Sequence, residues 1–140
     1  MAKITRMGQK NLTVSILIIL ILSSCDPVST LEANISNLTT ENLTIEFISP
    51  DESSSKIIQM ASGEMELFQE GFDIGGTYLE PSLIDYDSVV IKNQAGQILK
   101  VYKESDAGKN IYTINSYWIV DEPSRRFFKY YYEIENQDIK

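Results

Sequence analysis

Residues 43–47 read Leu-Thr-Ile-Glu-Phe, and this alternation of apolar and polar side chains decides the fold class. Successive side chains of a β-strand point to opposite faces, so the three apolar residues would share a buried face while the two polar ones meet water. Residues 31–36 alternate in the same way. Because a polar turn at 39–42 separates the two segments, we expect them to pair as an opening hairpin.

Further short strands are predicted along the rest of the chain, at residues 56–60, 64–69, 87–92, 97–102 and 125–135. Residues 111–114, as a strand or a turn, and residues 117–121 are additional candidates. A helix over 62–70 is the alternative for one of these segments, since Glu, Met and Leu favour helices. The segments 87–92 and 97–102 should form a second hairpin across Asn93–Gly96, with Leu99 and Val101 inward. We expect an irregular connection at 71–81, a turn at 122–124 and a frayed end at 136–140.

These segments give roughly seven to nine short strands, with turns every eight to twelve residues, which is the spacing of a two-sheet β protein. We therefore predict an all-β fold, an antiparallel sandwich of immunoglobulin-like or transthyretin-like type, over residues 31–140. A small barrel is the second choice. The chain has 140 residues, which is enough for one domain of this kind and too few for two.

The N-terminal segment has the layout of a secretory signal. Residues 1–11 carry three basic and no acidic side chains, and residues 12–22 are an apolar run. That run is well short of the about 20 residues that span a bilayer, so a permanent transmembrane anchor is the weaker interpretation.

The four residues that follow, Leu22-Ser23-Ser24-Cys25, resemble the lipobox of bacterial lipoproteins. The resemblance implies a signal peptide over 1–24, cleavage before Cys25, and a diacylglyceryl group on the Cys25 thiol. Residues 25–30 would then be a lipidated cysteine with a short linker. Two or three acyl chains hold a protein firmly on a membrane, whereas one chain alone holds it weakly.

Composition excludes several classes of function. The chain has no histidine, so it lacks the commonest general base and the commonest metal ligand. Its formal net charge is −8, and loss of Lys3, Arg6 and Lys10 with the signal peptide leaves nine basic and 20 acidic residues, a net charge of −11. Such a surface repels phosphate backbones, so we expect no nucleic-acid partner. We also expect no cofactor, no metal and no enzymatic activity.

Several stretches of the mature part resemble a group of small Bacteroidetes lipoproteins of unknown function. These stretches are Tyr-Asp-Ser-Val-Val-Ile at 86–91, Gly-Gln-Ile-Leu-Lys-Val-Tyr at 96–102, Tyr-Trp at 117–118 and Tyr-Tyr-Tyr-Glu-Ile at 130–134. The resemblance implies a lipid-anchored protein of the cell envelope, on the outer membrane in preference to the inner one. Asp26 resembles the inner-membrane retention signal of enteric bacteria, which is the competing placement.

Two groups of side chains are candidate sites. In a strand, Tyr130 and Tyr132 share one face, so Phe127 and Tyr131 would lie on the other and form a contact patch. Ordinary cross-strand packing is the simpler explanation of the same aromatics. Carboxylates such as Asp85 could gather around calcium or act in glycoside hydrolysis, but a solvated acidic edge is the better interpretation.

The sequence therefore favours a non-enzymatic interaction or structural module of the envelope, whose partner is another envelope protein. A glycan- or peptide-binding module that uses the exposed aromatic strand face is the alternative. A small hydrolase is a distant third, since any acidic protein offers paired carboxylates.

Overall fold

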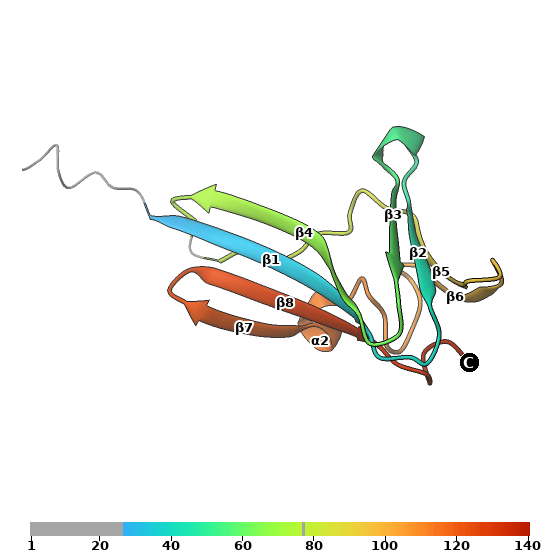
Figure 1. Cartoon of the computed structure of the whole chain (residues 1–140). Helices are drawn as coiled ribbons and strands as arrows, with labels where there is room; N and C mark the ends of the chain where they lie inside the picture. Colours follow the sequence, from blue (N-terminus) through green and yellow to red (C-terminus); the bar gives the residue numbers. More distant parts are fainter. Residues whose placement is uncertain (1–26, 77) are drawn as a thin grey trace, which may run out of the picture.

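Two four-stranded sheets pack face to face in the computed structural model, which describes residues 27–76 and 78–140 (Figure 1). The first sheet has the order β4 (Met65–Ile74), β1 (Val28–Asn37), β8 (Phe127–Ile134) and β7 (Ile119–Ser124). The second has the order β3 (Lys56–Met60), β2 (Leu43–Ile48), β5 (Ser88–Asn93) and β6 (Ile98–Tyr102). A 3-10 turn, η1 (Glu52–Ser54), and a short helix, α2 (Ile114–Tyr117), lie in the connections. The predicted all-β sandwich is confirmed, and the signal segment lies outside the described residues.

One strand pair departs from an all-antiparallel sandwich. β1 runs parallel to β8, whereas the other paired strands of the described part are antiparallel. The first strand of an immunoglobulin sandwich lies in the same sheet as the second. Here β1 and β2 lie in different sheets, so the strand order is not the immunoglobulin one.

The predicted opening hairpin is therefore wrong, because the turn after β1 carries the chain from one sheet to the other. Asn37 is fully buried at this corner. Its amide donates to the carbonyl oxygens of Glu41 at 2.8 Å and Ala61 at 2.9 Å, and its Oδ1 accepts from the Thr39 N–H at 3.0 Å. These bonds satisfy a buried polar side chain and fix a corner that the apolar alternation does not reveal.

The core fills the space between the sheets with the inward side chains of both. Phe47 of β2 stacks on Phe68 of β4, with ring centroids 4.7 Å apart. Tyr102 of β6 meets the ring of Tyr132 of β8 edge-on at 6.3 Å. Trp118 is also buried, and its indole N–H donates to the Ile111 carbonyl at 2.8 Å. The apolar face predicted for residues 43–47 is confirmed, since all three of its side chains are buried.

Several predicted boundaries were wrong, and strand pairing explains each. β4 continues through Gly71 to Ile74, because residues 71–74 pair with the first residues of β1. The chain does not turn at 122–124 but at Arg125–Arg126, where Arg126 has a φ of 64°. Val101 points outward, because the β5–β6 register places it opposite Val90, which lies between the buried Val89 and Ile91.

The two ends of the domain are also more ordered than predicted. β1 begins at Val28, three residues before the predicted start of the sandwich at residue 31. The expected fraying of 136–140 is wrong. Ile139 is buried, and the Asp138 carboxylate accepts from Lys109 Nζ at 2.7 Å and from the Glu135 N–H at 2.8 Å.

Candidate interaction face

The sheet β4-β1-β8-β7 has one side against the core and one side free, and we call the free side the outer face. Alternation along β8 assigns its residues: Phe128, Tyr130, Tyr132 and Ile134 are buried, whereas Phe127, Lys129, Tyr131 and Glu133 are only half-buried. Phe127 and Tyr131 therefore lie on the opposite side of the sheet from Tyr130 and Tyr132, as the alternation along this strand predicted.

Apolar side chains, which the solvent side of a sheet usually lacks, are exposed on the outer face. Its exposed apolar residues are Val28 of β1, Met65, Leu67, Phe72 and Ile74 of β4, and Ile119 of β7. Phe72 has 71% of its surface exposed and Ile74 has 60%. Apolar groups gathered on one face of a soluble domain indicate a surface that contacts a protein or a membrane.

A β-bulge brings the apolar residues of β4 to the same side. Opposite Ala33–Asn34 of β1, β4 carries an extra residue, Phe68, whose ring turns into the core. Met65 and Leu67 precede the bulge and Phe72 follows it. Strict alternation would put Phe72 on the opposite face from Met65 and Leu67, because their positions differ by an odd number. The bulge removes this mismatch, so the whole length of β4 presents apolar side chains outward.

Charged side chains cross the middle of the outer face. Lys129 Nζ lies 2.9 Å from Glu32 Oε2 and 5.2 Å from the centroid of the Phe127 ring. The hydrogen bond to Glu32 raises the pKa of Lys129. Glu70 of β4 lies directly opposite Glu32 in the β1–β4 register. Glu70 and Glu32 carry like charges and therefore form an unfavourable cross-strand pair. Glu32 already has a cationic partner in Lys129.

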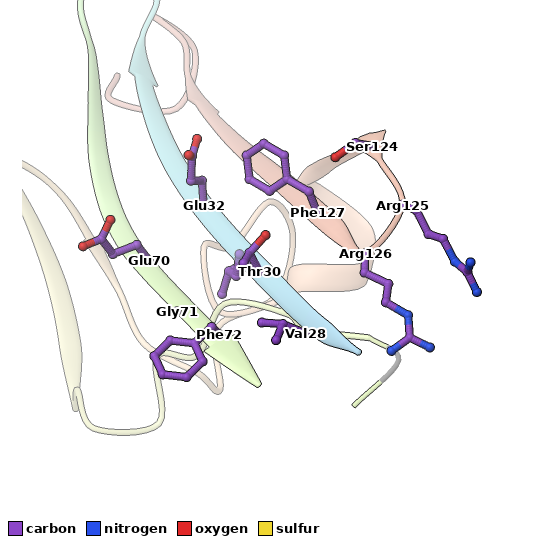
Figure 2. Close-up of a pocket in the computed structure, with 11 residues that line it drawn as sticks. Val28, Thr30, Glu32, Glu70, Gly71, Phe72, Ser124, Arg125, Arg126 and Phe127 are labelled. Atoms are coloured by element: carbon purple, nitrogen blue, oxygen red, sulfur yellow. The ribbon is translucent and has the colours of Figure 1, made fainter. Parts of the chain in front are cut away.

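An open groove of about 700 Å³ occupies the end of the outer face at which β1 begins. Strands β1 and β4 and the β7–β8 turn line it, with Phe72, Phe127 and Arg126 among its side chains (Figure 2). Figure 2 shows Glu32 and Glu70 farther up the sheet and both arginines extending from the turn. The backbone of this end is fixed, since the Thr30 N–H donates to the Arg126 carbonyl at 2.8 Å and Arg126 Nη1 donates to the Gly76 carbonyl at 3.1 Å.

The remaining predicted sites are Cys25 and the carboxylates around Asp85. Cys25 lies outside the described residues. Asp85 and Asp87 flank Tyr86 in the turn that precedes β5. Within residues 27–76 and 78–140, no group of three or more potential metal ligands comes together. No helix in the described part of the chain is long and apolar enough to cross a membrane.

Sequence reasoning found Phe127 and Tyr131 but missed Met65, Leu67 and Phe72 as members of the same face. Met65 and Leu67 share a face by plain alternation, whereas Phe72 joins them on that face only because of the bulge. Comparison with known proteins adds no assignment: no family model matches the chain, and no curated protein or solved structure matches it significantly.

Proposed function

We propose that this chain is a lipid-anchored protein of the bacterial cell envelope, non-enzymatic, whose β-sandwich binds another envelope protein through its outer face. The observation that carries the proposal is the set of exposed apolar side chains around Tyr131. In the strand register, Ile119 lies opposite Tyr131 on one side and Asn34 on the other, and Asn34 in turn faces Leu67. This row crosses all four strands of the sheet.

The side chains of this row are better suited to contact with a protein partner than to exposure to water. Ile119 is 53% exposed and Leu67 is 43% exposed, and burial of such side chains stabilises an association by about 25 cal/mol per Å² of apolar area. Aromatic and apolar side chains are enriched at the centres of protein interfaces, where Tyr is a frequent anchor. The charged residues Lys129 and Glu133 border the row on β8, as polar residues border most interfaces.

The anchor part of the proposal is supported by the lipobox-like Leu22–Cys25 and by the position of β1. The first strand begins at Val28, three residues after Cys25, so the domain would sit directly on its membrane. We place the protein on the outer membrane, following its resemblance to Bacteroidetes lipoproteins. Separation of inner and outer membranes by density would test this placement.

A matched pair of variants tests the interaction face. The tagged full-length chain should recover a stoichiometric envelope protein from detergent-solubilised membranes, and Leu67→Asp should abolish that recovery. Ile57→Asp is the control, because Ile57 is 64% exposed on β3 of the other sheet. Equal recovery by both variants, or no stoichiometric partner with the unmodified chain, would contradict the proposal.

The groove at the end of the outer face supports a second candidate, a binding site for a glycan or a peptide. The exposed Phe72 and the half-buried Phe127 are its aromatic side chains, and aromatic rings stack on sugars. However, Lys129 Nζ already lies over the Phe127 ring, so this ring is less available to a sugar. Glycan-array binding that Phe127→Ala and Tyr131→Ala both remove would favour this candidate over the protein-binding one.

A further inference from the structure

One end of the first sheet carries both exposed apolar side chains and the only arginines of residues 27–140. We call this end the tip and define it by Val28, Phe72, Ile74, Arg125 and Arg126. The three apolar residues are 49%, 71% and 60% exposed, in that order. Val28 pairs with Ile74 across the β1–β4 register, and Phe72 is two residues from Ile74 on the same face, so the three form one apolar patch. Figure 2 shows Val28 and Phe72 at this end of the sheet.

The tip is also the part of the described domain that the chain connects most directly to Cys25. Val28 follows Cys25 by three residues, and three extended residues reach about 10 Å. The start of β1, the end of β4 and the β7–β8 turn lie together at one end of the molecule, with the second sheet at the other (Figure 1). If Cys25 carries the lipid anchor, as proposed above, the tip lies within about 10 Å of the lipid surface.

We propose that the tip lies in the headgroup layer of the membrane, with Phe72, Ile74 and Val28 in contact with lipid and the two arginines beside the phosphates. Aromatic and aliphatic side chains at this depth leave water and contact the upper part of the lipid acyl chains. A guanidinium binds phosphate oxygens with planar, paired hydrogen bonds. This inference rests on the lipid anchor of the proposed function and adds to it a defined orientation.

The two arginines remain free to make such contacts. Among the described residues, neither guanidinium forms a salt bridge, and Arg126 uses only Nη1, toward the Gly76 carbonyl. Two acidic residues are close in sequence: Asp73 lies between Phe72 and Ile74, and Glu122 accepts a hydrogen bond from the Arg126 N–H at 2.7 Å.

The tip is therefore nearly neutral, in contrast to the acidic remainder of the domain. Apolar contact must supply most of the attraction to lipid, and the arginines set the depth. Because screening weakens interactions between exposed charges and leaves apolar contact intact, the contact should persist at high salt.

This orientation has a consequence for the proposed partner site. A strand rises about 3.3 Å per residue, so the ten residues of β1 lead about 30 Å away from the bilayer. The row formed by Ile119, Tyr131 and Leu67 would then stand above the lipid and remain open to a partner beside the protein. The outer face would thus divide into a lipid-facing end and a protein-facing middle.

Hydroxyl-radical labelling of the lipidated full-length chain tests the orientation. The chain is purified in detergent and reconstituted into vesicles of phosphatidylethanolamine and phosphatidylglycerol, and the Cys25→Ser chain in solution provides the reference. We expect severalfold protection of Phe72 in vesicles, at both low and high salt. Met65 is the internal control, because it is 51% exposed on the outer face at the other end of β4, and its labelling should not change.

A second comparison separates lipid contact from a change in fold. Ile74→Asp should restore labelling of Phe72 to its value in solution, whereas Ile57→Asp on the other sheet should leave Phe72 protected. If the protein floats with the vesicles but Phe72 is labelled as strongly as in solution, the tip proposal is overturned and the lipid anchor is not. If the chain purified from membranes does not float with the vesicles in a density gradient, the lipid anchor is overturned, and the tip proposal is overturned with it.

Discussion

Replacing Tyr132 by Ala should destabilise the domain far more than the same change at Tyr131. The two tyrosines are neighbours on β8 and point to opposite sides of the sheet. Tyr132 is fully buried, with its ring 5.4 Å from Trp118 and 6.3 Å from Tyr102. Tyr131 is half-buried on the outer face, in register with Asn34 of β1.

The magnitude follows from the area that each ring removes from water. A buried tyrosine covers about 150–250 Å², which corresponds to about 4–6 kcal/mol at about 25 cal/mol per Å². Measured losses for large aromatic residues changed to Ala are about 3–5 kcal/mol. We therefore expect a loss of about 4 kcal/mol for Tyr132→Ala and about 1 kcal/mol for Tyr131→Ala, because the latter keeps much of its surface in water.

Urea titration of the Cys25→Ser chain, followed by far-ultraviolet circular dichroism, measures both changes. With an m-value of about 2 kcal/mol/M, the midpoint should fall by about 2 M for Tyr132→Ala and by about 0.5 M for Tyr131→Ala. Equal shifts, or a larger shift for Tyr131→Ala, would show that Tyr131 belongs to the core and would refute the assignment of the outer face.

Three further predictions concern single side chains. Asn37→Ala should lower the free energy of unfolding by about 3 kcal/mol in the same urea assay, because it leaves buried backbone groups at the corner between the sheets without partners; a loss below about 1 kcal/mol would argue against the corner. Burial, followed by the charges of Asp87 and Glu104, raises the pKa of Tyr112 to about 12 from 10.0. The stability that its neutral phenol contributes is complete below pH 10 and is lost as the pH rises toward 12, so Tyr112→Phe should reduce the slope of unfolding free energy against pH in this window. An unchanged slope would contradict this assignment. Glu70→Gln should stabilise the domain by about 0.5 kcal/mol in thermal or urea unfolding by removing the like charge opposite Glu32, and the gain should shrink in 1 M salt; destabilisation would mean that Glu70 has a favourable partner.

The fold class could be predicted from the sequence because alternation is a local property. Residues 43–47 show this directly, since each of their apolar side chains is buried in β2. Strand pairing is not local, which is why the segments 31–36 and 43–47 were wrongly joined in a hairpin. The partners of β1 are β4 and the last strand, β8, and no feature of residues 31–36 identifies either.

The candidate site shows the same limit. Tyr131 could be placed on the outer face, because β8 is regular over its eight residues. Phe72 could not, because residues 71–81 were expected to be irregular and because the bulge at Phe68 reverses the alternation after it in β4. The turn at Arg125–Arg126 was also missed, since Pro123 suggested an earlier turn and Arg126 adopts a positive φ that is unusual for a residue other than glycine.

The most direct test of the central claim, that lipid on Cys25 holds this domain against its membrane, is the mass of the chain purified from membranes of a bacterial host. Tandem mass spectrometry of the N-terminal peptide should show a chain that begins at Cys25 and carries a diacylglyceryl group on the thiol. A chain that retains residues 1–24 uncut, or a mature chain whose Cys25 is absent or carries no lipid, would contradict the account.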